Sequence, residues 1–94
     1  MARRLYIVTY DIRAVKRWRR LFHLMKKRGA HRQLSVFLVL AETSRIRRLA
    51  GEIAAIIDPT VDAVLIAPID RAASDRMIEL GLPGPMPGAR LLVI

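Results

Sequence analysis

One carboxylate near the start of the chain is surrounded in the sequence by basic residues. Asp11 is the only acidic residue among the first 41, and it ends an apolar run that begins at Leu5. Carboxylate oxygens bind hard cations such as Mg2+ or Mn2+, and such an ion polarises phosphodiesters and activates water. One Asp11 from each of two protomers, meeting across a two-fold axis, would hold one ion between them. The alternative is that Asp11 caps the next helix or pairs with Arg13 or Lys16.

The positive charge is concentrated in the first third of the chain. The net charge is +9, and residues 1–32 hold eleven of the seventeen basic side chains with Asp11 as their only acid. A polyanion is the natural partner for such a segment, although a solubilising surface is the simpler alternative. The residues expected to contact phosphates are Arg13, Lys16, Arg17, Arg19, Arg20 and Arg32.

Composition excludes several classes of site. The chain has no cysteine, so it has no disulfide or thiolate metal site, and we expect a cytoplasmic protein. His23 and His31 are the only histidines, too few for a zinc site, and we interpret them as surface or backbone-bonding residues. No apolar run approaches the roughly 20 residues of a membrane helix, and the first segment lacks a signal-peptide cleavage site. Five aromatic residues are too few for an RNA-recognition module, which needs exposed aromatics on its sheet.

The spacing of apolar residues predicts alternating strands and helices. Residues 5–10 are β-branched and aromatic on both faces, as in a central strand. Residues 14–28 have helical period, with Trp18 on the apolar stripe and Gly29 as the C-terminal cap. Residues 33–40 form an extended stretch.

The second half repeats this alternation. Thr43 or Ser44 caps a helix that ends at Asp58-Pro59. A strand over 61–69 and a short helix over 71–80 follow. The next residues, 81–90, are rich in proline and glycine and lead to an apolar tail, Leu91–Ile94.

This order predicts an α/β (α+β) fold, the ferredoxin-like βαββαβ sandwich with an extra C-terminal strand. The fold needs two strands between its helices, so residues 31–41 must form two very short strands or one long bent one. We expect one domain over 1–80. Residues 81–94 would then be a linker and a strand that docks on the sheet edge of a partner protomer in a homodimer.

Three sequence motifs at this spacing resemble those of a known family. They are YIVTYDI at 6–12, the QLSVF run at 33–37 and Asp62 at the start of a strand, with Gly29 between the first two. Together they resemble the CRISPR-associated protein 2 family. The resemblance implies a homodimer that binds duplex DNA and bridges integrase subunits during spacer acquisition. Some members of that family are metal-dependent nucleases that act on RNA or DNA.

The resemblance also implies a set of site residues. Asp11, Tyr10, Ser35 and Phe37 match positions linked to nuclease activity, with Asp11 binding Mg2+ (or Mn2+) shared across the dimer. By residue type alone Tyr10 and Phe37 are core aromatics, and Ser35 has no partners for a catalytic triad. Many relatives carry acids where this chain has Arg13-Ala14-Val15 and Leu38, which predicts a weaker metal site and favours DNA binding without cleavage. The alternative function is a toxin-like, metal-dependent ribonuclease of the same fold.

Overall fold

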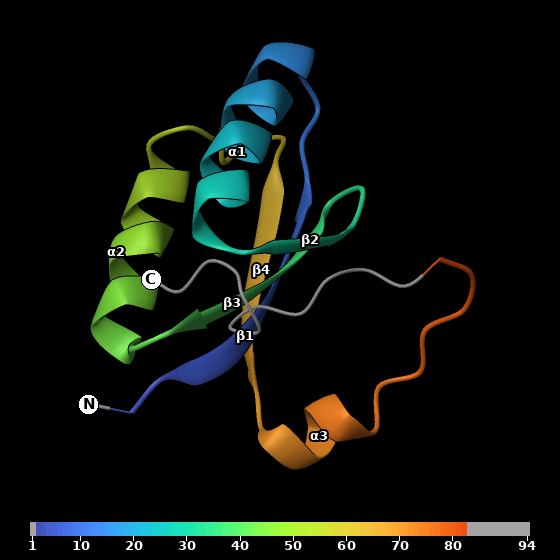
Figure 1. The fold of residues 1–94 in the computed structure, drawn as a ribbon. Coiled ribbons are helices and arrows are strands. Elements are labelled where there is room, and N and C mark those ends of the chain that lie inside the picture. Colours follow the sequence, from blue (N-terminus) through green and yellow to red (C-terminus); the bar gives the residue numbers. More distant parts are fainter. Residues whose placement is uncertain (1, 83–94) are drawn as a thin grey trace.

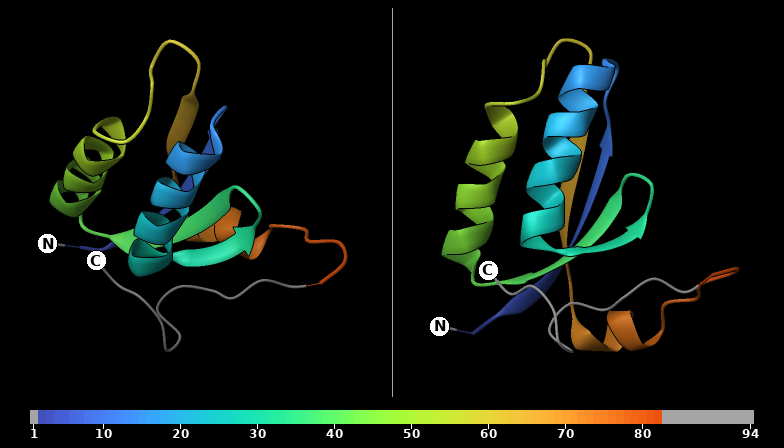
Figure 2. Two further views of the ribbon diagram at one scale, coloured as in Figure 1. Left: turned by 90° about the horizontal axis from the view of Figure 1, so that it is seen from above. Right: turned by 45° about the horizontal axis from the view of Figure 1, so that its top comes forward.

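The sheet is built around the first strand of the chain. The computed structural model describes residues 2–82, and its elements are β1 (Arg4–Asp11), α1 (Val15–Arg28), β2 (Ala30–Gln33), β3 (Val36–Ala41), α2 (Thr43–Ala54), β4 (Ala63–Ile69) and α3 (Arg71–Asp75). The strand order is β2-β3-β1-β4, and every neighbouring pair is antiparallel. With α1 and α2 lying side by side over the sheet (Figures 1 and 2), this is the predicted ferredoxin-like arrangement.

The alternation of side chains along β1 divides the molecule into two layers. Tyr6, Val8 and Tyr10 are buried beneath the helices, whereas Leu5 and the other alternate residues lie on the opposite face. The apolar stripes of both helices complete the core. Its fully buried large side chains are Phe37, Leu21, Met25, Leu49, Val8 and Val39. Leu38 is also buried, but it pairs with Ile7 and so lies on the opposite face of the sheet.

The segment between the helices forms two strands, and this resolves the length problem. A turn at residues 34–35 separates β2 from β3, and β2 begins at Ala30, before the predicted extended stretch. Predicted helix ends differ from the structure in three places. The second helix, predicted to end at Asp58-Pro59, ends at Ala54. The N-cap of α2 is Glu42 rather than Thr43 or Ser44, without a side-chain capping bond, and the third helix ends at Asp75. The predicted tail strand, 91–94, lies outside the described residues.

Gly29 ends α1 as predicted, but for a different physical reason. Its N–H donates to the carbonyl of Met25, and its φ of −159° is extended rather than left-handed. A Cβ at this position would lie 2.6 Å from the carbonyl oxygen of Leu38 and 2.8 Å from Val39 Cγ2. Glycine is therefore required by the close approach of β3, which packs directly against the end of the helix.

Candidate functional site

Asp11 lies at the end of β1, on the face of the sheet that the helices leave uncovered. It pairs in register with Ala63 of β4, and its side chain follows Thr9 in the alternation, opposite to Tyr10. The Asp11 carboxylate is 67% exposed and forms an ion pair with Arg13, whose NH2 lies 3.2 Å from Oδ2. The alternative of a local ion pair is therefore present in the structure, whereas the N-cap of α1 is Ala14, with no side-chain capping bond. An exposed ion pair of this kind contributes at most about 1 kcal/mol, so a ligand can displace it.

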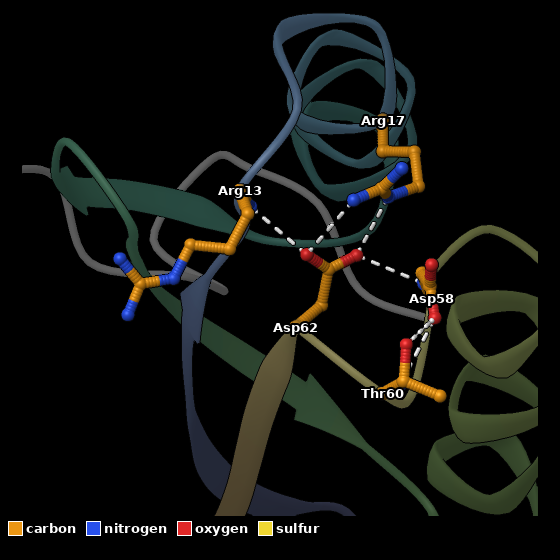
Figure 3. Close-up of polar contacts among 5 residues, drawn as sticks. All are labelled: Arg13, Arg17, Asp58, Thr60 and Asp62. Carbon is orange, nitrogen blue, oxygen red and sulfur yellow. Dashed lines mark hydrogen bonds and ion pairs between the residues drawn. The ribbon is translucent and has the colours of Figure 1, made fainter.

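A second carboxylate, Asp62, fixes the loop that follows Asp11 (Figure 3). Asp62 precedes β4, and its side chain is fully buried. Its Oδ1 accepts from the main-chain N–H of Arg13 at 2.9 Å and from Arg17 NH2 at 3.2 Å. Its Oδ2 accepts from Arg17 Nε at 2.7 Å and from the main-chain N–H of Asp58 at 2.8 Å. One buried side chain thus joins the start of α1 to the turn before β4.

These contacts also set the charge state of the turn. The hydrogen bond from Arg17, followed by those from the main chain, lowers the pKa of Asp62 well below its ordinary value of 3.8. The pKa of Asp58 is lowered as well, first by the Thr60 hydroxyl, which donates to Oδ1 at 2.6 Å. Both carboxylates remain ionised at neutral pH.

The other predicted catalytic residues lie on the far side of the sheet from Asp11. Tyr10 and Phe37 are buried and stacked, with ring centroids 6.3 Å apart. Ser35 Oγ is 3.5 Å from Trp18 Nε1, and Trp18 stacks on Phe22 in the core layer as expected. The structure therefore separates Asp11 from the three residues predicted to act with it.

His31 differs from its predicted surface or backbone-bonding role. Its ring stacks on Phe37 at 4.8 Å and meets the edge of Phe22 at 5.1 Å. Its Nε2 and the hydroxyl of Tyr10 are buried atoms without a hydrogen-bond partner within residues 2–82. This cluster could not be predicted from the sequence. His31 and Phe37 meet because the chain reverses at residues 34–35, and no Gly, Pro, Asn or Asp marks a hairpin there.

The structure divides the six predicted phosphate contacts into two groups. Lys16, Arg19 and Arg20 are exposed on α1 and have no carboxylate partner among the residues described. The other three are held by acids of the chain. The pairs are Arg13 with Asp11, Arg17 with Asp62 and Arg32 with Glu79.

Lys16, Arg20, His23 and Lys27 follow one another at i, i+4, i+7 and i+11 and are all exposed. They therefore form one row along the outer face of α1. No acidic residue interrupts the helix between its ends. This row is one part of the first basic segment that is available to a polyanion.

The donors around Asp11 decide whether one chain can hold a metal ion. Within residues 2–82 no three His, Cys, Asp or Glu side chains come together as a metal site. Both oxygens of Asp62 are occupied by hydrogen bonds, so it is unsuitable as a second ligand. Mg2+ is commonly bound by one or two carboxylates together with water. Asp11 therefore fits such an ion where a second copy of the chain supplies another carboxylate.

Comparison with known proteins agrees with this architecture. The family model described as CRISPR associated protein Cas2 matches residues 4–77, which include β1 to β4, α1 and α2. The chain belongs to the Cas2 family. A CRISPR-associated endoribonuclease Cas2 of Geobacter sulfurreducens is 47% identical over 62 residues, which cover 66% of this chain and 65% of the relative.

A further relative and two solved structures extend the match. CRISPR-associated endoribonuclease Cas2 1 of Synechocystis sp. is 33% identical over 93 residues, covering 94% of this chain and 99% of the relative. A hypothetical protein of Thermus thermophilus, TT1823, has a TM-score of 0.76 at 30% identity, over 90% of this chain and 98% of its own. Streptococcus pyogenes Cas2 has a TM-score of 0.75 at 24% identity, over 82% and 99%, which supports the fold. None of the helices in residues 2–82 has the length and apolar character to span a bilayer.

Proposed function

We propose that the chain is a nucleic-acid-binding subunit of CRISPR adaptation, in which the outer face of α1 contacts the phosphates of duplex DNA. The observation that carries this proposal is the unpaired cationic row on α1. Lys16 and Arg20 face solvent in that row, Arg19 lies beside it, and nearby Arg17 is neutralised by Asp62. Contacts of this type are independent of base sequence and weaken with salt.

A second copy of the chain is the proposed partner of the uncovered face of the sheet. The register places Leu5, Ile7, Leu40, Leu65 and Ile69 on that face; Leu65 is 61% exposed and the other four are half-buried. Two such faces packed together would bury apolar surface that a single chain leaves open to water. Asp11 ends a strand of this face, so the same packing would bring it towards Asp11 of the partner subunit. We also propose, from the family, that the dimer bridges integrase subunits in the cytoplasm.

Cleavage of nucleic acid is a second proposed function, and the position of Asp11 favours it. The relatives named above as endoribonucleases make RNA a substrate to test beside DNA. Asp11 and Asp11 of the partner subunit would hold Mg2+ or Mn2+, while Lys16 and Arg20 hold the phosphate backbone. When bound, such an ion polarises a phosphodiester and lowers the pKa of a bound water. The chain itself supplies one carboxylate per copy, consistent with slow cleavage or binding alone.

The binding proposal is tested by the salt dependence of affinity for a short DNA duplex. We expect log Kd to rise with log salt, and the slope to fall by about 0.9 for each phosphate contact removed. The variant Lys16→Gln/Arg20→Gln should lose about 1.8 from the slope. Arg71→Gln/Arg76→Gln removes the same charge from the region of α3, at the far end of the molecule, and should change it little. Equal slopes for all three proteins would overturn the proposal.

The cleavage proposal is tested with Asp11→Asn on RNA and DNA substrates in Mg2+ or Mn2+. This change keeps the shape of the side chain but weakens its affinity for the ion, so cleavage should stop while duplex binding remains. Activity that persists in Asp11→Asn or in a chelator would contradict the metal site. Absence of cleavage by the unaltered protein would restrict the function to binding.

A further inference from the structure

A second group of arginines lies on α2, and the proposed function does not account for it. Arg45, Arg47 and Arg48 are exposed, and no carboxylate pairs with any of them among the residues described. The only acid within α2 is Glu52, which pairs with Arg28 of α1 at 3.0 Å. These three arginines are therefore an uncompensated positive patch on the second helix of the outer layer.

Their position opposes the local stability of the helix. The first turn of α2 has no acidic residue, and Arg45 lies in that turn, where the helix dipole disfavours a cation. Arg45 and Arg48 are three positions apart, so their like charges also repel each other. An acid at position 45 would stabilise the helix. Residues that contradict local preference in this way are expected at functional surfaces.

The ion pair between the helices shows which arginines face α1. Glu52 lies on the side of α2 that reaches Arg28. Arg45 and Arg48 precede Glu52 by seven and four positions, so they lie on that same side of the helix. On α1, Arg20 precedes Arg28 by eight positions, which places it about 80° round the helix from Arg28, towards the outer face. Figures 1 and 2 show the two helices next to each other on one side of the sheet.

The chemistry of the patch favours nucleic acid over protein. The exposed large apolar side chains of the described residues are Val15, Leu34, Val61, Leu65, Met77, Ile78, Leu80 and Leu82, and none lies on α2. Protein interfaces usually depend on buried apolar or aromatic anchors, whereas nucleic-acid interfaces are polar and strongly positive. The exposed arginines of α2, which have no large exposed apolar side chain on the same helix, match a nucleic-acid interface.

We infer that Arg45 and Arg48 of α2 form a second phosphate-contacting row, which binds the strand of a duplex opposite to the strand that α1 contacts. Neighbouring helices lie roughly 10 Å apart, comparable with the spacing of the two backbones across a DNA groove, which is about 6 or 12 Å wide. One cationic row on α1 and one on α2 can therefore each contact a different phosphate backbone of the same duplex. This inference rests on the proposed binding by α1 and adds to it a preference for duplex over single-stranded DNA.

The test compares duplex and single-stranded DNA in the dimer-forming full chain. Arg45→Gln/Arg48→Gln should lower the salt slope for a 20-base-pair duplex by about 1.8 and its affinity roughly tenfold. In the same variant, affinity for a single-stranded oligothymidine should change less than about twofold. Lys16→Gln/Arg20→Gln should instead weaken the binding of both duplex and single-stranded DNA. The melting temperature of the α2 variant should be unchanged or higher, because unfavourable charges have been removed from the helix.

The outcomes separate this inference from the proposed function. An unchanged duplex slope in the α2 variant, with a reduced slope in the α1 variant, overturns the inference and leaves binding by α1 in place. Equal losses on duplex and single-stranded DNA also overturn it, because the second row would then not distinguish two strands. If neither variant changes duplex binding, the proposed function itself fails. Arg45→Lys/Arg48→Lys retains the charges and should restore most of the affinity if the α2 contacts are electrostatic.

Discussion

Arg17 donates to both oxygens of Asp62, with Nε 2.7 Å from Oδ2 and NH2 3.2 Å from Oδ1. These residues are 45 positions apart in the sequence, and their contact joins the first turn of α1 to the residue that precedes β4. Asp62 also holds the main-chain N–H of Arg13, two residues beyond Asp11. The position of Asp11 therefore depends on a buried carboxylate that contacts no substrate in the proposed function.

Replacing Asp62 with Asn should destabilise the fold and change its response to acid. The folded-state pKa of Asp62 is lowered, so its stabilising effect is complete above its ordinary value of 3.8 and is lost as the pH falls below it. Near neutral pH, the melting temperature of Asp62→Asn should be roughly 10 °C below that of the unaltered protein. On acidification to about pH 3, the melting temperature of the variant should fall by less than that of the unaltered protein, because the variant lacks this carboxylate. Asp70→Asn is the control, because Asn remains a good N-cap for α3. Equal melting temperatures near neutral pH would contradict this role of Asp62.

Arg17 should behave as a structural residue, although its sequence context predicts a phosphate contact. Its guanidinium is committed to Asp62, whereas that of Arg20 faces solvent. We expect Arg17→Gln to lower the melting temperature while changing the salt slope of duplex binding little. Arg20→Gln should do the reverse, keeping the melting temperature and reducing the slope by about 0.9. Similar slope losses for both variants would show that Arg17 leaves Asp62 to bind DNA.

The strands and helices were largely predictable, because their apolar periodicity is local. Residues 5–10 and 14–28 fall within one residue of β1 and α1 at each end. The hairpin after Gly29 was harder to predict, since its turn consists of Leu34 and Ser35 without Gly, Pro, Asn or Asp. The order of elements still identified the fold.

The candidate site was predictable only where it depends on local sequence. Asp11 at the end of the first strand and the cationic face of α1 follow from charge and spacing. The pairing of Arg32 with Glu79 and of Arg17 with Asp62 does not, because each joins residues about 45 positions apart in the sequence. Alternation along the strand already implied that Tyr10 and Asp11 lie on opposite faces. The resemblance grouped them as one site, whereas the structure puts the sheet between their side chains.

Tyr10 should make the protein sensitive to alkali. Burial raises the pKa of Tyr10 from 10.0 to about 12, so the neutral hydroxyl is favoured in the folded state. Its effect on stability is therefore complete below about pH 10 and is lost as the pH rises towards 12. A titration of tyrosinate absorbance should show a late-titrating group that is missing from Tyr10→Phe.

The same variant tests the unpartnered hydroxyl of Tyr10. Because this buried oxygen lacks a hydrogen-bond partner within residues 2–82, Tyr10→Phe should keep or raise the melting temperature near neutral pH. Tyr6→Phe is the comparison, since the Tyr6 hydroxyl lies 3.5 Å from Thr43 Oγ1. It should lose a little stability near neutral pH and retain the late-titrating group. A marked loss of stability in Tyr10→Phe would show that its hydroxyl is bonded in solution.

Two glycines provide a matched pair for testing the close contact at the end of α1. Gly29→Ala places a Cβ against the carbonyl oxygen of Leu38 at 2.6 Å, and backbone must move to relieve this overlap. We expect a loss of roughly 1–3 kcal/mol in the free energy of unfolding, measured by urea denaturation. Gly51→Ala adds a Cβ with nothing within 4 Å in the exposed interior of α2, and should gain about 0.5–1 kcal/mol. A tolerated Gly29→Ala would mean that α1 and β3 separate easily at this point, and that the register of Ala30 with Leu38 is not fixed by the glycine.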